Sequence, residues 1–297
     1  MLDKPYGISS NKAVQIAKYI FSAAKCGHTG TLDPVATGLL PLCFGEATKF
    51  SSILLDANKT YYAQLKLGFL SSTGDVEGEI LRTEAADKEP SRYECELVLK
   101  QFVGTITQIP PMHSALKYRG KPLYAYARGG EIIERQAREI TIHNIRIESL
   151  MHNELHLSIA CGSGTYIRTL AEDIGKALGC GGAYLTALRR TEIGGVDISQ
   201  AQSLSKLEAL DASTLKDCLL PIDSFLAGLP SITLDEASAL HLIQGRVVPY
   251  PWNDDVSIYP ALARIYDDTH RFLGLGEITA ERTIISKRLL SNDYFVH

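Results

Sequence analysis

Residues 154–182 combine a strand pattern, a glycine turn and a helix pattern in one continuous stretch. In ELHLSIAC, apolar residues alternate with polar ones, which is typical of a strand with one buried face. The next residues, GSGT, suit a turn, and YIRTLAEDIGKAL repeats apolar residues at the spacing of an amphipathic helix that ends at Gly179. The chain therefore combines strands with helices, and this turn is a natural position for a functional site.

Further strand and helix patterns are separated by turn residues. Apolar residues recur at helical spacing from Asn11 to Phe21, behind Ser9 and Ser10 as candidate N-caps. The stretch KTYYAQLKLGFL is rich in aromatic and alternating residues, as strands are, and SSTGDVEGEI after it is rich in turn formers. We expect a helix, a strand and a loop at these three places.

The helical patterns end near residues 228–230. Beyond them, strand-like pieces such as GRVVPY, ALARIY and RFLGLGEI are joined by Asp, Thr and Gly turns. We therefore expect a first domain at residues 1–228 and a small β-rich domain at residues 229–297. A chain of 297 residues, of which 45% are hydrophobic, can fill the cores of two such domains.

The composition narrows the class of protein. The net charge of -4 gives no overall attraction to nucleic acid or anionic membranes, so a polyanionic partner must meet a local basic patch. The six cysteines form no CxxC pair, which argues against a zinc site and a disulfide framework and favours a reducing compartment. The N-terminus resembles no export signal, and no apolar run approaches the roughly 18 residues of a membrane span. We expect a cytoplasmic protein with no membrane attachment.

A lone carboxylate, Asp33, stands between glycines in GHTGTLDPVATGLLPL. Asp followed by Pro often begins a helix, with Asp as the N-cap and Pro at the first helical position. A cap does not need the surrounding glycines, however, and these indicate backbone that another group approaches closely. A metal site built from Cys26, His28 and Asp33 is disfavoured, because the spacing matches no zinc pattern and a fourth ligand is missing. The residues alone leave both a helix cap and a reacting carboxylate open.

Arg168, in GTYIRT, falls in the first turn of the expected helix. The helix dipole disfavours a cation there, so Arg168 needs an anionic partner. Glu172, four residues on, would give an exposed pair worth about 0.3 kcal/mol. A distant buried carboxylate would instead be held ionised and oriented by the guanidinium. Both alternatives stay open on the residues alone.

The segment from His113 to Arg138 is basic although the whole chain is acidic. Its cations are Lys117, Arg119, Lys121, Arg128, Arg135 and Arg138, and its tyrosines are Tyr118, Tyr124 and Tyr126. Cations beside aromatic rings suit contacts to phosphates and to bases or sugars, although a solvated loop has a similar composition. Arg189 and Arg190 form a second candidate phosphate contact with the same alternative.

Five stretches of the sequence together resemble one protein family. They are GHTGTLDPVATGLLPLCFGEATK, KTYYAQLKLG, STGDVEG, QIPPMHSALKYRGKPLYAYARGG and CGSGTYIRTLAEDIGKALGCGGAYLTALRRTEIG. Their order and spacing resemble the TruB family of tRNA pseudouridine synthases. The match covers most of residues 1–195, and the combination of motifs is highly specific.

The resemblance implies a reaction, a partner and a fold. The reaction is isomerisation of uridine to pseudouridine at position 55, in the T-arm stem-loop of tRNA, by base flipping and without a cofactor or metal. The implied fold is α/β (α+β): a mixed β-sheet catalytic domain with flanking helices and an RNA-clamping insertion at about residues 108–138, followed by a small β-rich, PUA-like RNA-binding domain. We expect a monomer with no obligate protein partner.

The family's functional residues match single positions of this chain. Asp33 matches the catalytic aspartate, Arg168 the arginine that pairs with it, and Tyr61 the tyrosine that packs on the target base and is proposed to take part in proton transfer. The implied substrate-binding residues are His28, which contacts the everted nucleotides, Asp75, Tyr166, and the insertion residues Lys117, Arg119 and Arg128. Ordinary packing remains the alternative for Tyr61 and His28, and a turn-forming role remains the alternative for Asp75.

Two features depart from the family pattern. His113 stands where the family usually has an aromatic residue, which leaves a stacking contact unsupported but touches no chemical role. The family normally has a short apolar strand before the position of LDKP. We therefore expect a few N-terminal residues to be missing and one sheet edge to be weakened.

The chemistry of the isomerisation suits these residue types independently of the resemblance. The glycosidic bond must break, the base must turn over, and its C5 must bond to the ribose. A carboxylate can serve as nucleophile, charge stabiliser or base, and an aromatic platform supports a base that has left its stack. Beside Arg168, Asp33 is expected to have a lowered pKa and to act as an anion.

Two other classes of protein remain as alternatives. A non-catalytic RNA-binding or tRNA-folding protein would keep the basic insertion but would not need Asp33, Tyr61 and Arg168 together. A small-molecule enzyme with an Asp nucleophile, such as an aspartyl-phosphate hydrolase, commonly pairs two acids in D-x-D, and TLDPVAT lacks the second.

Overall fold

The computed structural model describes residues 1–250 and 261–291, and the chain forms two compact units. The first unit comprises Met1–Ala17, His28–Leu42 and Leu55–Ala209, and the second comprises Lys18–Gly27, Cys43–Leu54 and the described residues from Leu210 onward. Two early segments thus group with C-terminal residues, which the sequence patterns do not indicate. The domain division after residue 228 stays a prediction, and part of the expected second domain lies outside the described residues.

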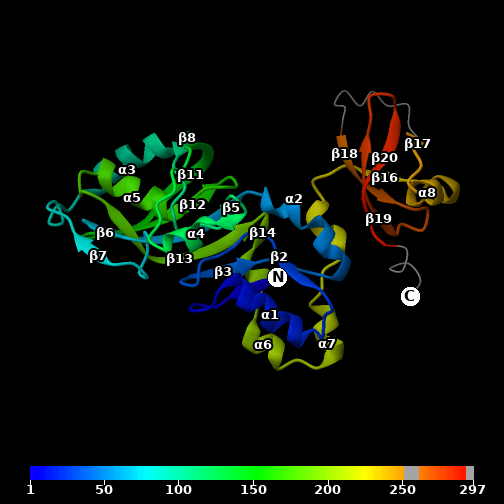
Figure 1. The fold of residues 1–297 in the computed structure, drawn as a ribbon, viewed down its shortest axis with the longest axis horizontal. Helices are drawn as coiled ribbons and strands as arrows, with labels where there is room; N and C mark the ends of the chain where they lie inside the picture. Colours follow the sequence, from blue (N-terminus) through cyan, green and yellow to red (C-terminus); the bar gives the residue numbers. More distant parts are fainter. Residues whose placement is uncertain (251–260, 292–297) are drawn as a thin grey trace. The chain divides into compact units, whose positions relative to one another are not determined.

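A mixed sheet that has nine strands in the described part of the chain forms the framework of the first unit (Figure 1). In order across the sheet the strands are β15 (Gln202–Ser203), β1 (Leu2–Lys4), β3 (Ala36–Leu40), β13 (Ala183–Ile193), β5 (Lys59–Leu67), β12 (Glu154–Cys161), β11 (Arg138–Met151) and β8 (Gly104–Gln108), with β14 (Val196–Asp197) paired to β13. Strand β1 is parallel to β15, β3 is parallel to β13, and the other neighbours are antiparallel. The mixed sheet confirms the predicted fold class.

Helices and short hairpins complete the two units. The α-helices are α1 (Ser10–Ile20), α2 (Ser51–Leu55), α3 (Arg92–Leu99), α4 (Leu123–Ala127), α5 (Ile167–Ala177), α6 (Leu204–Glu208), α7 (Ala212–Asp217) and α8 (Glu236–Ile243). The 3-10 helices are η1 (Gly45–Phe50), η2 (Lys100–Phe102), η3 (Ile198–Gln200) and η4 (Ile222–Leu226). Three two-stranded sheets pair β2 (Cys26–His28) with β4 (Leu42–Phe44), β6 (Phe69–Ser71) with β7 (Ile80–Arg82), and β9 (Lys117–Tyr118) with β10 (Lys121–Pro122).

The alternating residues of β5 and β12 place one face of the sheet in the core. Leu65 of β5 lies directly opposite Leu155 of β12, and both are buried. Tyr61 and Ile159 form the next-but-one pair on the same face. Helix α5 packs against β13 and β5, and α3 packs against β11 and α5, so the two helices cover neighbouring parts of the sheet (Figure 1). Alternation in β5 therefore directs Tyr61 into the interior.

The predicted helix starts and stops agree with the structure to within a residue. Helix α1 begins at Ser10, and the Ser9 hydroxyl accepts a hydrogen bond from the Lys12 N–H at 3.1 Å, so Ser9 is the N-cap. After α5 the chain turns at Gly179, where the Cys180 N–H donates to the Gly175 carbonyl at 3.0 Å. The strand–turn–helix pattern is thereby confirmed.

Of the two alternatives left open for Asp33, the helix cap is excluded, because no helix begins there. The Ala36 N–H donates to the Asp33 carbonyl at 3.1 Å, which closes a turn, and strand β3 follows directly. Strand β3 lies between β1 and β13, and four of its five residues are buried. A strand that is buried on both faces has apolar residues on each of them, so the alternation that marks a strand is missing from its sequence. Such a run cannot be told from the first turns of a buried helix.

The second unit contains a five-stranded sheet built from C-terminal residues. Its strands, in order, are β16 (Ser231–Thr233), β18 (Ala261–Tyr266), β19 (Phe272–Ile278), β20 (Thr283–Leu289) and β17 (Val248–Pro249). Buried side chains such as Ile232, Ile265 and Ile284 form its core together with Leu242 of α8. The three predicted strand pieces correspond to β17, β18 and β19, whereas β16, α8 and β20 had no predicted counterpart.

No helix within residues 1–250 and 261–291 has the length and apolar character needed to cross a lipid bilayer.

Gly38 gives a test of how closely β3 and β13 approach. Its φ is +101°, and a Cβ there would lie 2.2 Å from the Arg190 carbonyl oxygen. We expect Gly38→Ala to lower the free energy of unfolding by about 3 kcal/mol or more, since the backbone pair cannot move apart cheaply. Gly104→Ala is the matched control, because Gly104 has a φ of +104° and no atom within 4 Å of such a Cβ. It is expected to cost about 1–2 kcal/mol, and equal losses in urea denaturation would contradict the close approach.

Candidate active site

Hydrogen bonds to the backbone fix the loop that carries Asp33. The Gly7 N–H donates to the Pro34 carbonyl at 2.9 Å, and the Lys4 ammonium donates to the same oxygen at 3.3 Å. Lys4 is fully buried, and this burial lowers its pKa to about 8, although the nearby Asp33 carboxylate acts in the opposite direction. Strand β1 and the chain after it therefore hold the residue that follows Asp33.

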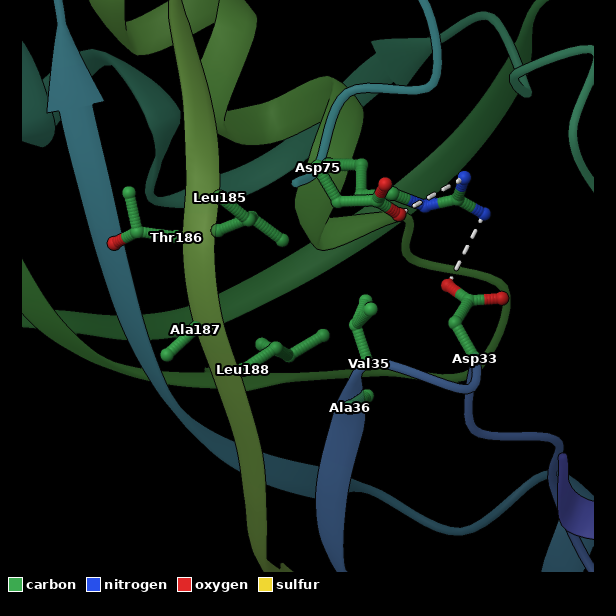
Figure 2. Close-up of a pocket in the computed structure, with 9 residues that line it drawn as sticks. Asp33, Val35, Ala36, Asp75, Leu185, Thr186, Ala187 and Leu188 are labelled. Carbon is green, nitrogen blue, oxygen red and sulfur yellow. Dashed lines mark ion pairs between the residues drawn. The ribbon is translucent and has the colours of Figure 1, made fainter. Parts of the chain in front are cut away.

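The guanidinium of Arg168 bridges two carboxylates. Its Nη2 lies 3.1 Å from Asp33 Oδ2, and its Nη1 lies 3.6 Å from Asp75 Oδ2, as the dashed lines in Figure 2 mark. The same nitrogens donate to two backbone carbonyls, Nη1 to Thr73 at 2.9 Å and Nη2 to His113 at 2.6 Å. The Arg168 side chain is only 8% exposed, so these contacts replace water around the charge.

The exposed partner proposed for Arg168 is engaged elsewhere. Glu172 forms an ion pair with Lys176 at 2.5 Å along the surface of α5. Arg168 is buried and meets Asp33 instead. The structure therefore favours the distant-carboxylate alternative over the surface pair.

Asp75 combines a turn with an ion pair. Its Oδ1 accepts hydrogen bonds from the Thr73 hydroxyl at 2.6 Å and from the Glu77 N–H at 3.0 Å, which are contacts of a turn-forming Asp. Its Oδ2 faces Arg168. Oδ1 therefore makes the contacts of a turn-forming Asp, and Oδ2 is the oxygen that faces the guanidinium.

Apolar side chains close one side of this ion-pair cluster. Val35 lies beside Asp33 and Leu185 lies beside Asp75, and Leu188 lines the same space of about 10 Å³ (Figure 2). Such a space holds about one water molecule. The apolar wall keeps bulk water away and so strengthens the attraction between the charges.

A larger cavity of about 540 Å³ opens beside the same carboxylate. Asp33, Tyr61, Tyr166, Arg168, Leu188 and Arg190 are among its lining residues, together with Ser114–Leu116 of the insertion and Gly162 and Gly164 of the glycine turn. Its size falls within the range of small-ligand pockets. Tyr61 is 8% exposed; burial raises the pKa of its phenol, against the opposite effect of Arg190.

The pKa of Asp33 is raised, which corrects the expected lowering. Burial raises it most, and the Asp75 carboxylate raises it further. Arg168 lowers it, as do Lys4 and His113, but these cations together do not offset burial and the Asp75 carboxylate. The sequence showed the partner of Asp33 but not the loss of water around it.

Tyr166 is held at the start of α5 by a side chain from β8. The Gln108 amide oxygen accepts from the Tyr166 N–H at 2.8 Å, and its nitrogen donates to the Tyr166 carbonyl at 3.1 Å. Burial raises the pKa of the Tyr166 phenol, which lines the large cavity. Gln108 thereby connects the first residue of the insertion to the site.

His28 lies in β2 and is not a lining residue of the large cavity. Burial lowers the pKa of its imidazole, and the charge of Arg190 lowers it further. Its Nδ1 is buried and has no hydrogen-bond partner within the described residues. His28 is thus held neutral beside the loop that leads to Asp33.

Arg189 and Arg190 both have partners within the chain, and the phosphate contact expected of them stays a prediction. Arg189 pairs with both oxygens of Asp3, at 3.0 and 2.7 Å. Arg190 is 1% exposed and donates to the carbonyls of Leu39 and Gly30. Adjacent residues of a strand face opposite sides of a sheet, so the two arginines cannot form one patch.

The insertion presents exposed cations that lie against tyrosine rings. Arg119 lies 5.3 Å from the centre of the Tyr118 ring, and Arg128 lies 5.4 Å from that of Tyr124. Lys117 is exposed on the same hairpin. These stacked cations support the predicted nucleic-acid surface, because stacking orders the charge before a phosphate arrives.

Sequence reasoning missed Lys4, Gln108 and Lys59 as parts of the site. Lys59 lines the large cavity and donates to the carbonyls of Leu55 and Ala57, at 2.8 and 2.6 Å. The alternation that directs Tyr61 inward also directs Lys59 inward, and this signal was available. Nothing local marks Lys4 or Gln108, because their partners are distant in sequence.

Within residues 1–250 and 261–291, no group of three or more His, Cys, Asp or Glu side chains is arranged to hold a metal ion.

Three family models together match most of the chain. "TruB family pseudouridylate synthase (N terminal domain)" matches residues 18–167, "tRNA pseudouridylate synthase B C-terminal domain" matches residues 168–227, and "Pseudouridine synthase II TruB, C-terminal" matches residues 230–290. The third match coincides with the five-stranded sheet and agrees with a PUA-like C-terminal domain.

Curated relatives and solved structures resemble the chain over almost its full length. The tRNA pseudouridine synthase B of Nitrosospira multiformis is 58% identical over 98% of this chain and 94% of that protein, and that of Pseudomonas putida is 45% identical over 99% and 95%. The structure of the archaeal box H/ACA sRNP Nop10-Cbf5 complex matches with a TM-score of 0.73 at 21% identity, over 100% of this chain and 87% of that chain, and so shares the fold. The chain therefore belongs to the TruB family of pseudouridine synthases, isomerases that convert uridine to pseudouridine in tRNA.

Proposed function

We propose that the enzyme acts on the uridine at position 55, in the T-arm stem-loop of tRNA, with Asp33 as the reacting anion and Arg168 and Tyr61 as its catalytic partners. One observation carries this proposal. The Asp33 carboxylate is bound to a buried guanidinium at the side of a 540 Å³ cavity that Tyr61 also lines. A carboxylate held in one orientation beside a nucleotide-sized space suits attack on, or charge stabilisation of, a flipped nucleotide.

The reaction rearranges atoms of the uridine without adding any. The bond between ribose C1′ and base N1 breaks, C5 bonds to C1′, C5 loses its hydrogen as a proton, and N1 gains a proton. No oxidant or reductant is needed, which supports action without a cofactor. Asp33 supplies negative charge at the reacting centre. Arg168 holds the Asp33 carboxylate in place and contacts the Asp75 carboxylate at the same time.

The flipped base requires a closed pocket. Tyr61 offers an aromatic ring on the inner face of β5, and Tyr166 and Leu188 line the same cavity. An enclosed site keeps a detached base beside the ribose while it turns over. His28 and Asp75 act in the same proposal, His28 toward the everted nucleotides and Asp75 through Arg168.

The insertion is proposed to bind the sugar–phosphate backbone of the T-arm through Lys117, Arg119 and Arg128. Its residues Ser114–Leu116 line the cavity, so the segment reaches both the RNA surface and the reacting centre.

Release of tritium from a T-arm stem-loop labelled at uridine C5 tests the function directly. We expect the parent enzyme to release tritium without added metal or cofactor, and Asp33→Asn to release none, because the amide carries no charge. Glu172→Gln is the matched control and should behave as the parent, since Glu172 pairs with Lys176 on the surface of α5, away from the lining of the cavity. Tight binding of the stem-loop without tritium release by the parent would favour the RNA-binding alternative.

The acid limb of the pH–rate profile tests the state of Asp33. Activity should be lost as the pH falls through the pKa of Asp33, which lies above the ordinary value of 3.8. Arg168→Met should move this limb to higher pH, since the guanidinium lowers that pKa, and Asp75→Asn should move it to lower pH, since the second carboxylate raises it. The check is kcat/KM from pH 4 to 8 for the three proteins, and shifts of the same sign in both variants would refute the assignment.

The salt dependence of stem-loop binding tests the insertion. Replacing Lys117, Arg119 and Arg128 together by Ala should reduce the slope of log K against log salt by about 2 to 3, since each phosphate contact contributes roughly 0.7–0.9. A control triple variant removes three exposed cations outside the insertion, Lys100, Arg146 and Lys206. An unchanged slope in the insertion variant, measured by filter binding, would exclude these phosphate contacts.

A further inference from the structure

Arg190 is a buried cation that forms no ion pair with a carboxylate within the described residues. It lies on β13 and is 1% exposed, which makes it one of the largest fully buried side chains. Taking a charge out of water without a counter-ion is costly, and an apolar residue would fill such a position more cheaply. The position of Arg190 therefore calls for an explanation beyond packing.

Two hydrogen bonds fix the orientation of the Arg190 guanidinium. Its Nε donates to the Leu39 carbonyl of β3 at 2.7 Å, and its Nη2 donates to the Gly30 carbonyl at 3.0 Å. A Cβ at Gly30 would lie 3.3 Å from Nη1, so the loop backbone rests directly on the guanidinium. Gly30 lies three residues before Asp33, and Arg190 thus anchors the loop that carries the carboxylate.

The phenol of Tyr61 lies beside the same guanidinium. Arg190 and Tyr61 are directly opposite each other in the β13–β5 ladder, and both line the large cavity. The positive charge of Arg190 acts on the phenol by lowering its pKa, against the larger effect of burial. An arginine can only donate, so in a hydrogen bond between these two facing side chains the phenol oxygen accepts and the Tyr61 O–H points away from Arg190.

The other ionisable groups that face Tyr61 do not take its proton. Cys161 on β12 has a thiol pKa raised to about 11 by burial, so this thiol is neutral near pH 7. Lys59, two residues along β5, is a second buried cation and donates to Leu55 and Ala57. Asp33 is the anion on the cavity side, where the substrate enters.

We propose that Arg190 is a positioning residue of the reaction, which turns the Tyr61 hydroxyl toward the base in the cavity and holds the Asp33 loop beside it. The inference rests on the proposed function and deepens it. In this arrangement Tyr61 stays protonated, since burial raises its pKa, and presents its O–H as a donor to the uracil ring as the base leaves C1′. Arg190 itself contacts no reacting atom.

A double-mutant cycle tests whether Arg190 acts through Tyr61. Single-turnover rates of tritium release are measured for the parent, Arg190→Met, Tyr61→Phe and the double variant. We expect Tyr61→Phe to lose about 10²-fold and Arg190→Met roughly tenfold or more. The double variant should lie within about twofold of Tyr61→Phe alone, because an orientation effect disappears with the hydroxyl. Losses that multiply, or a parent-like rate in Arg190→Met, would overturn the proposal.

Arg190→Lys and two controls separate this role from a structural one. Lysine keeps the charge but offers one nitrogen, so it cannot bond to Leu39, Gly30 and Tyr61 together, and we expect it to restore the rate only in part. Tyr62→Phe controls for loss of a tyrosine hydroxyl, since Tyr62 bonds to His156 at 2.9 Å, and Arg146→Met controls for loss of an arginine. Both should retain the parent rate. The stem-loop Kd should stay unchanged in Arg190→Lys, whereas a merely structural role would weaken binding and rate together.

Ultraviolet titration gives a readout that does not depend on activity. The difference in absorbance at alkaline pH between each protein and its Tyr61→Phe partner reports the ionisation of Tyr61. Loss of the guanidinium should move this ionisation to higher pH in Arg190→Lys or Arg190→Met, because Arg190 lowers that pKa. An unmoved titration would overturn the proposal even if the stem-loop is not the substrate. Absence of tritium release by the parent would instead count against the proposed function alone.

Discussion

The site depends on one buried cation, Arg168, which is shared by two carboxylates and two backbone carbonyls. A guanidinium with this little access to water needs anions and hydrogen-bond acceptors around it, since an unpaired buried charge costs several kcal/mol. Its partners come from the loop before β3, from the turn after β6 and from the insertion, and Arg168 itself lies on α5. The charge of Arg168 therefore joins four segments that the rest of the fold only brings near one another.

The central sheet positions the other polar side chains that line the large cavity. Antiparallel pairing of β5 with both β12 and β13 places Tyr61, Lys59 and Arg190 on the inner face, beside the start of α5. The polar groups around Arg168 therefore differ in kind from those around Arg190 and Lys59. Arg168 faces two carboxylates as well as carbonyls, whereas Arg190 and Lys59 donate to carbonyls and form no ion pair within the described residues. The cavity is therefore bounded by an ion-pair cluster and by cations of a second kind. A nucleotide with negative charge on its phosphates and developing charge on its base fits such a space.

Several local features were predictable because they depend on neighbours in sequence. The start of α1, the end of α5 and the alternation of β12 follow from capping residues, a terminal glycine and apolar spacing. The sequence could not decide between a helix cap and another role for Asp33, because the strand that follows is buried on both sides and its period of two is hidden. The lowered pKa expected for Asp33 was also wrong, because the sequence shows which partner is available but not how much water is lost. Arg189 and Arg190 were grouped as one patch, although neighbours on a strand face opposite sides of the sheet.

The sequence by itself determined the family and the residue types at the reacting centre, because motif order and spacing are properties of the chain. It also determined the strand that carries Tyr61, the helix that carries Arg168 and the basic insertion, but not the strand that follows Asp33. Only the tertiary structure decided which partner each charged residue has. Asp33 and Arg168 are 135 positions apart, and Lys4, Gln108 and Arg190 likewise act on residues far along the chain. Burial and long-range pairing arise only when the sheet closes, and they set the pKa values and the direction in which each side chain points.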